Sequence, residues 1–209
     1  MRPKRTSISS LNLSRRGIPK EFHNATLDDL KDFGSEDRRV VNTFVRDYIE
    51  NIHSQFQNNK GIILSGSNGV GKSFIASLII KYAYVNRYTS RRCTLVEYKD
   101  AYTRMWGSKS PSEKEELEEQ FYLNFKAVEF LALEEIGKDI TLNNTTVGIL
   151  EDLLRYREER GLVTIICTNY TRVDLIDKYG SSINSLIQGN CTAIRIVDSD
   201  KRQEHYKER

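Results

Sequence analysis

The sequence predicts an α/β domain in which helices cover both faces of a mostly parallel β-sheet. Two observations indicate this fold. Short apolar runs alternate with longer helical patterns, and one apolar run leads directly into a glycine-rich loop and a second apolar segment. In sheets of this kind ligands bind at the carboxyl ends of the strands. The residues that follow each strand are therefore the candidate functional residues.

The chain begins with a segment of low periodicity. Residues 1–34 are rich in polar side chains and predict a basic, extended or partly disordered lead-in to a domain at 35–209. Six basic residues lie within the first 20 positions, whereas five glutamates lie within 113–119. Such charges usually belong to a solvated tail or helix face, and an arm that binds a polyanion is the alternative interpretation.

Five strands are predicted from the apolar runs and the residues that flank them. They are 61–64, 93–98, 127–133, 162–167 and 192–197. An amphipathic helix at 41–52 precedes the first strand, Pro111 opens an acidic helix before the third, and Gly161 ends the helix before the fourth. Arg195 interrupts the last apolar run, so its side chain is expected to face solvent.

A phosphate-binding loop follows the first strand, because residues 66–73 fit the pattern G-x-x-x-x-G-K-[ST]. Glycines allow a tight turn with positive φ, so that successive N–H groups point at phosphate oxygens, and the next helix adds its positive dipole end. Lys72 is expected to reach the β- and γ-phosphates, and the Ser73 hydroxyl to ligate Mg²⁺. The residues expected to bind the nucleotide are Gly66, Ser67, Asn68, Gly69, Val70, Gly71, Lys72, Ser73 and Phe74.

Polar residues also end the third and fourth strands. Phosphoryl transfer to water requires a carboxylate for the metal shell and a group that positions the water. We assign Glu134 to the metal shell and Glu135 to the water, because adjacent residues at a strand end point in different directions. The alternative is that both glutamates merely end a buried strand in solvent. Asn169 can hydrogen-bond the γ-phosphate, although asparagine is also a common turn residue.

Composition excludes several classes of protein. No apolar run approaches the roughly 20 residues that cross a bilayer, so no membrane partner is expected. The basic N-terminus lacks the apolar segment of a secretory signal, which makes the cytoplasm the default location. The three cysteines lack C-x-x-C spacing and the three histidines are scattered, so no metal other than nucleotide-bound Mg²⁺ is expected.

Taken together, these segments resemble the bacterial replicative helicase loaders of the AAA+ class, the DnaC/DnaI group, and the related transposition ATPase IstB. The similarity extends over 17–202, and the segments 134–137, 168–169 and 189–202 are more specific than the phosphate loop. The resemblance implies the AAA+ (ASCE) P-loop NTPase fold, with a five-stranded parallel sheet of order 5-1-4-3-2.

The resemblance also implies roles for individual residues. Lys72 and Ser73 correspond to Walker A, Glu134 and Glu135 to Walker B, Asn169 to sensor 1 and Arg202 to sensor 2. The catalytic set is then Glu135, Lys72, Asn169 and Arg202. The implied activity is hydrolysis of ATP with Mg²⁺, coupled to opening a hexameric replicative helicase or loading it on single-stranded DNA.

Three departures from the family pattern bear on this activity. Glu134 replaces the usual aspartate, and its additional methylene predicts slow hydrolysis. Serines at 181–185 stand where the family carries the arginine that reaches a neighbouring site. Either Arg172 serves instead, or self-association does not complete the site. The family's N-terminal helicase-binding domain has no counterpart before Gly17, which predicts a reduced form of the loader.

A further predicted surface would contact DNA. Lys99, Tyr102, Arg104 and Trp106 interleave aromatic and basic side chains, the mixture that stacks bases and holds phosphates. Ordinary packing is the alternative explanation for Tyr102. Two other functions stay open: an IstB-type regulator that binds duplex DNA, and a nucleotide-gated binding module that scarcely hydrolyses ATP.

Overall fold

The computed structural model describes residues 9–30, 36–108, 110–138 and 143–197. A single parallel sheet forms its centre, with strand order β2-β3-β4-β1-β5. Read from the other edge this is the predicted order 5-1-4-3-2, so the predicted fold is confirmed. The strands are β1 Gly61–Ser65, β2 Ser90–Thr94, β3 Phe130–Ile136, β4 Val163–Thr168 and β5 Cys191–Arg195.

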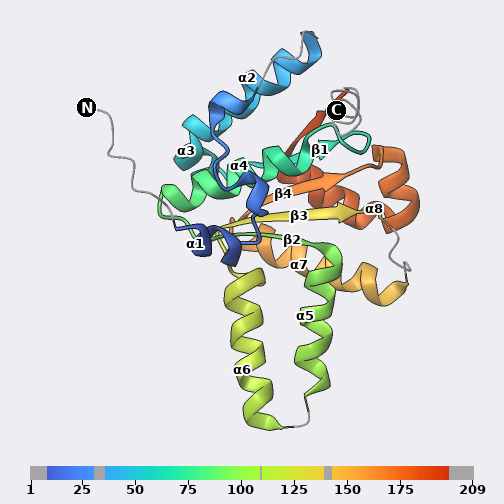
Figure 1. Cartoon of the computed structure of the whole chain (residues 1–209). Helices are drawn as coiled ribbons and strands as arrows, with labels where there is room; N and C mark the ends of the chain where they lie inside the picture. Colours follow the sequence, from blue (N-terminus) through green and yellow to red (C-terminus); the bar gives the residue numbers. More distant parts are fainter. Residues whose placement is uncertain (1–8, 31–35, 109, 139–142, 198–209) are drawn as a thin grey trace, which may run out of the picture.

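Helices cover both faces of the sheet (Figure 1). One face packs against α2 Glu36–Glu50, α3 Ile52–Gln57 and α4 Lys72–Val85. The other packs against α7 Asn144–Glu159 and α8 Arg172–Asn190. Within β1, Ile62 and Leu64 belong to the first core and Ile63 to the second, because successive strand side chains point to opposite faces.

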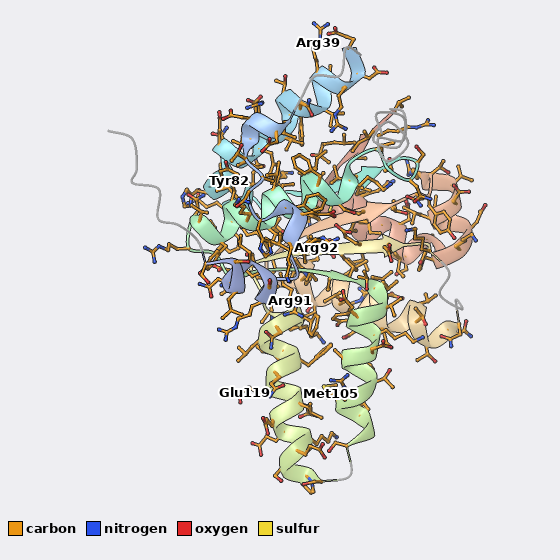
Figure 2. The ribbon with its side chains drawn as sticks, viewed as in Figure 1. Arg39, Tyr82, Arg91, Arg92, Met105 and Glu119 are labelled. Carbon is orange, nitrogen blue, oxygen red and sulfur yellow. The ribbon has the colours of Figure 1, made fainter. Side chains whose placement is uncertain are left out.

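A helical hairpin projects from the body of the molecule between β2 and β3 (Figure 1). It consists of α5 Leu95–Gly107 and α6 Pro111–Phe121, followed by the short π-helical segment η3 Tyr122–Lys126. Figure 2 shows Met105 on α5 and Glu119 on α6 within this hairpin. Tyr98 and Phe121 pack together at its base, with ring centroids 5.1 Å apart, which fixes the hairpin to the second core.

The second strand was predicted in the wrong place. It ends at Thr94, and the residues predicted to complete it begin α5 instead. The Thr94 Oγ accepts a hydrogen bond from the Glu97 N–H, and the Glu97 carboxylate accepts one from the Thr94 N–H, a capping box that starts a helix. The true strand was missed because it lies at the edge of the sheet and carries the charged residues Arg91 and Arg92, which break the apolar pattern of a strand.

The lead-in also differs from the expectation of an extended or partly disordered segment. Its described part, 9–30, forms α1 Ser10–Arg15, the 3₁₀ turns η1 Lys20–Phe22 and η2 Leu27–Asp29, and lies against α4 and β2 (Figure 1). The apolar residues that it buries are Leu13, Ile18, Ala25 and Leu30. The Lys81 ammonium of α4 donates to two of its carbonyls at 2.7 Å, and burial lowers the pKa of this lysine. The domain boundary at residue 34 stays a prediction.

Candidate functional site

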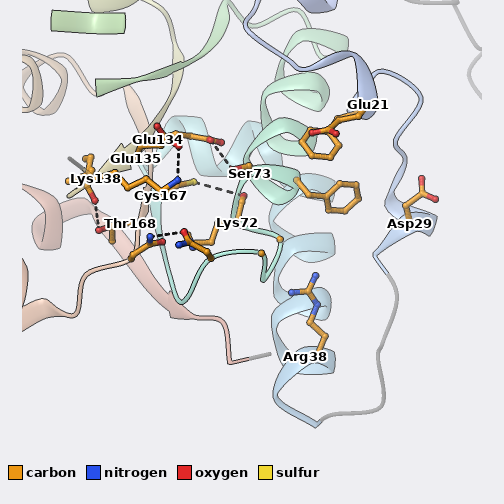
Figure 3. A pocket seen from close by; sticks show the side chains of 17 residues that line it. Glu21, Asp29, Arg38, Lys72, Ser73, Glu134, Glu135, Lys138, Cys167 and Thr168 are labelled. Atoms are coloured by element: carbon orange, nitrogen blue, oxygen red, sulfur yellow. Dashed lines mark hydrogen bonds and ion pairs between the residues drawn. The ribbon is translucent and has the colours of Figure 1, made fainter. Parts of the chain in front are cut away.

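A cavity of about 510 Å³ opens at the carboxyl ends of β1, β3 and β4 (Figure 3). The lead-in and α2 close its other side through Glu21, Phe22, Asp29 and Arg38. The residues predicted for nucleotide, metal and catalysis that line the cavity are Asn68, Gly69, Gly71, Lys72, Ser73, Phe74, Glu134, Glu135 and Asn169. Chain segments that are far apart in the sequence therefore meet where a parallel sheet places its ligands.

The backbone of the predicted phosphate loop requires its glycines. Gly66, Gly69 and Gly71 have φ values of +150°, +79° and +94°, a region that other residues rarely adopt. A Cβ at Gly66 would also lie 2.4 Å from the Ile196 carbonyl oxygen. Gly71 directly precedes α4, so the loop delivers its N–H groups to the positive end of a helix of 14 residues. Such an arrangement favours an anion.

The Lys72 side chain folds back over this loop. It donates to the carbonyl oxygens of Gly66 and Ser67 at 2.8 and 2.6 Å, which places its charge within the curve of the loop. A phosphate held by the loop would lie within reach of the same nitrogen. Three residues predicted to bind the nucleotide, Gly66, Ser67 and Val70, do not line the cavity, and the Val70 side chain is buried.

Glu134 lies inside the site and is 2% exposed. Its Oε2 accepts a hydrogen bond from the Ser73 hydroxyl at 2.8 Å, so the two residues predicted for the metal are in direct contact (Figure 3). A hydroxyl and a carboxylate are hard oxygen donors of the kind that Mg²⁺ prefers. Among the described residues no group of three or more His, Cys, Asp or Glu side chains is placed to hold a metal ion by itself. The donor set suits a metal that takes its remaining ligands from phosphates and water.

Glu135 is exposed although it directly follows the buried Glu134, and the strand is irregular at this point. The φ of Glu135 is +59°, and the pairing of β3 with β4 shifts register between Leu133 and Ile136. The Glu135 carboxylate forms an ion pair with Lys138, with 3.0 Å between nitrogen and oxygen. Both residues line the cavity, so this acid stays accessible from it while Glu134 is buried.

Asn169 joins the end of β4 to the phosphate loop. Its Nδ2 donates to the Asn68 Oδ1 at 2.9 Å. The preceding Thr168 is buried, and its hydroxyl donates to the Ile136 carbonyl at 2.7 Å, which ties the ends of β3 and β4 together. Asn169 also lines the cavity.

The remaining predicted residues lie elsewhere. Lys99, Tyr102, Arg104 and Trp106 are on α5, in the projecting hairpin, and do not line the cavity. Arg202 lies outside the described residues. Arg172 is exposed at the first turn of α8. The structure thus brings together the loop, the paired acids and the asparagine, and it separates the predicted DNA-contacting residues from them.

Three cations of the site were missed in the sequence. Arg92 of β2 binds both carboxylate oxygens of Glu134, Lys138 pairs with Glu135, and Arg38 of α2 donates to the Val70 carbonyl at 2.9 Å. Arg92 lies in a strand that the sequence did not predict. The other two depend on tertiary packing.

An aromatic contact borders the loop on the lead-in side. The rings of Phe22 and Phe74 meet edge to face, with centroids 5.6 Å apart, and both residues line the cavity. Cys167 contributes to the cavity lining from β4, and burial raises the pKa of its thiol well above the usual value. Phe22 and Phe74 thus make the lead-in side of the cavity apolar, whereas Cys167 lies near Lys72 and Glu134.

No protein-family model matches the chain, and no curated protein matches it by sequence. Solved structures are nevertheless similar. The DnaC helicase loader superposes with a TM-score of 0.71 at 20% identity, over 86% of this chain and 100% of that one. DnaI gives 0.67 at 20% identity, over 86% and 94% of the two chains. AMPPCP-bound DnaA from Aquifex aeolicus gives 0.62 at 19% identity, over 88% and 55%.

These similarities agree with the strand order of the sheet and with the position of the cavity at the strand ends. Identities near 20% establish the fold rather than the activity. Over most of its length, the chain therefore has the same fold as the DnaC helicase loader and DnaI.

Proposed function

We propose that this chain is an ATP-dependent helicase loader, or a loader-like replication ATPase, that acts on a hexameric replicative helicase and single-stranded DNA. One observation carries the proposal: the phosphate loop, the Ser73–Glu134 contact and the Asn169–Asn68 contact meet at a single cavity. The similarity to DnaC across 86% of the chain supports a loader over other kinds of nucleotide-binding protein.

ATP binding would use the loop and its lysine. The Lys72 ammonium now contacts two loop carbonyls, and phosphate oxygens would replace them as acceptors of stronger, charge-assisted hydrogen bonds. The base would lie on the apolar side, against Phe22 and Phe74. The lead-in thus takes part in the proposed nucleotide site.

Ser73 and Glu134 would hold Mg²⁺ on the phosphate side of the cavity. Bound Mg²⁺ would neutralise charge on the β- and γ-phosphates. Glu135 would accept a proton from the attacking water, and Asn169 would hydrogen-bond the γ-phosphate. Arg202 as the sensor 2 arginine, and Arg172 as an arginine supplied to a neighbouring copy, stay predictions.

A second candidate function has a specific observation in its favour. The Glu135 carboxylate is paired with Lys138 at 3.0 Å, so it must leave this partner before it can bind and position a water. A chain in this state would bind ATP and hydrolyse it slowly, acting as a nucleotide-gated binding module in the cytoplasm. Turnover with and without DNA distinguishes the two, since robust hydrolysis in either condition eliminates the module.

The α5–α6 hairpin is the proposed DNA-contacting element. Arg104 and Trp106 are exposed on α5, and the Trp106 side chain has 56% of its surface accessible. Tyr102 packs against Phe121, with ring centroids 5.8 Å apart, so packing accounts for this residue at least in part. The Lys114 ammonium lies 4.4 Å from the Trp106 ring centroid. The proposed DNA contact is therefore assigned to the exposed side chains of Arg104 and Trp106.

The proposal is tested by measuring DNA binding as a function of nucleotide. With AMPPCP and Mg²⁺, the affinity for single-stranded DNA is expected to rise, and the Trp106→Ala variant is expected to lose about 1–3 kcal/mol of that binding, the value of one base stack. The exposed Val96→Ala change on the same helix is the control. A preference for duplex DNA would instead indicate the IstB-type alternative, and capture of a replicative helicase only with nucleotide would support the loader.

A further inference from the structure

Arg92 lies between the lead-in and the proposed metal site. Its Nε donates to the Glu134 Oε1 at 2.8 Å and its Nη2 to the Oε2 at 2.6 Å, so the guanidinium grips both carboxylate oxygens. Its Nη1 donates to the Gly17 carbonyl at 2.9 Å. The side chains of this pair are 15% and 3% exposed, which makes the contact well shielded from water.

The backbone of Arg92 is joined to the same part of the lead-in. Its N–H donates to the Arg16 carbonyl at 2.8 Å, which occupies a hydrogen-bonding position on the edge strand β2. Gly17 has a φ of +73°, and a Cβ there would lie 1.9 Å from the Arg92 carbonyl oxygen. The lead-in can approach β2 this closely only because residue 17 is glycine.

Glu134 connects Arg92 to Ser73, because its carboxylate contacts both side chains. The Oε2 that Arg92 binds also accepts the Ser73 hydroxyl proton, so the lone pairs of the Ser73 oxygen remain available to a metal. A glutamate has more rotatable bonds than an aspartate, and its carboxylate would otherwise have freedom to turn. The bidentate contact with the planar guanidinium fixes the orientation of the carboxylate. A lysine ammonium would fix it less well.

From this chain of contacts we infer that Arg92 is a positioning residue for Mg²⁺: it holds Glu134, Glu134 orients Ser73, and the docked lead-in holds Arg92. The inference deepens the proposed function and rests on it, because it requires Mg²⁺ with a nucleotide at the phosphate loop. Partners that orient the ligands of a metal typically contribute a factor of 10–100 to metal affinity.

The alternative is that the ion pair only stabilises the fold. Buried ion pairs are not reliably stabilising, so stability alone cannot separate the two roles. Figure 2 shows the adjacent Arg91, which offers a matched comparison. Its Nη1 also donates to the lead-in, at the Arg15 carbonyl, but its guanidinium lies over the Phe125 ring and does not contact Glu134.

The experiment measures AMPPCP binding to the full chain while Mg²⁺ is titrated, and again in EDTA. The Arg92→Gln variant is expected to need about 10–100 times more Mg²⁺ for half of the metal-dependent gain in affinity. Its AMPPCP affinity in EDTA is expected to match the wild type within about twofold, because no group that contacts phosphate has changed. Arg92→Lys should fall between the two, and Arg91→Gln should behave as the wild type.

The Gly17→Ala variant tests the lead-in separately, and a higher Mg²⁺ requirement is expected there too. Thermal unfolding of each variant identifies any that fail to fold, and Arg92→Lys keeps the charge if Arg92→Gln does not fold. An unchanged or lower Mg²⁺ requirement in folded Arg92 variants overturns the inference and leaves the proposed function intact. Wild-type protein that binds no AMPPCP at any Mg²⁺ concentration contradicts both.

Discussion

Glu134 and Glu135 are neighbours in the chain but lie in opposite environments. Glu134 is buried and gripped by Arg92, whereas Glu135 lines the cavity and pairs with Lys138 on its accessible side. The buried acid suits an orienting role, since its carboxylate has a fixed position. The accessible acid suits proton transfer, because a base must reach the water that it activates.

This division predicts the behaviour of a single substitution. Glu135→Gln is expected to lower ATP turnover by a factor of about 10²–10⁴, the usual loss when a general base is removed, with little change in ATP affinity. Steady-state hydrolysis and nucleotide titration on the same preparation measure the two effects. Glu119→Gln, an exposed change on α6, is the control. Turnover that survives in Glu135→Gln would remove this residue from the mechanism.

A site residue could be predicted from the sequence where a short stretch of neighbouring residues marks it. The glycines and Lys72 form a continuous motif, and Glu134, Glu135 and Asn169 directly follow apolar runs. Arg38 and Lys138 carry no such mark, because they meet the site only through packing of α2 and a turn after β3. The sequence therefore predicted the residues expected to bind the nucleotide. It did not predict Arg38, Arg92 and Lys138, the cations that contact those residues.

At the scale of elements, the start of α5 shows how a cap competes with a strand pattern. Residues 93–98 are β-branched or aromatic at several positions and predict a strand, yet Thr94 and Glu97 form a complete capping box. Two satisfied backbone N–H groups at a helix start outweigh a weak strand preference. The capping box could have been predicted from Thr94 and Glu97 in the sequence. The edge strand β2, which carries two arginines, could not.

The capping box can be tested through stability. Thr94→Ala is expected to reduce the free energy of unfolding by about 1 kcal/mol, because the Glu97 N–H loses its acceptor. Urea denaturation followed by circular dichroism measures this change. Thr103→Ala, at an exposed position inside the same helix, should be neutral or slightly stabilising. Equal effects of the two changes would show that the cap contributes nothing specific.

At the scale of the whole molecule, the sheet order was predictable and the lead-in was not. Alternating strands and helices predicted a mostly parallel sheet, and the family resemblance implied the order of its five strands, which the structure confirms. The lead-in buries isolated apolar residues such as Leu13 and Ile18, which produce no periodic pattern. Its docking depends instead on one glycine and on carbonyls that accept from Arg92 and Lys81.

The docked lead-in changes what the molecule can do. It forms one wall of the cavity, through Glu21, Phe22 and Asp29, and it reaches Glu134 through Arg92. Any partner that displaced residues 9–30 would remove this wall of the cavity. No helix among the described residues is long and apolar enough to cross a membrane.

ATP binding by the phosphate loop, in the cavity at the strand ends, is the property on which both proposals depend. The most direct measurement is the affinity of the whole chain for ATP with Mg²⁺, compared between the wild type, Lys72→Ala and Lys60→Ala. Lys60 is exposed just before β1, at the opposite end of the strand from the loop. Loss of charged hydrogen bonds predicts about 10–100-fold weaker binding for Lys72→Ala and no change for Lys60→Ala. Equal ATP affinity in all three proteins would show that the phosphate loop does not bind ATP.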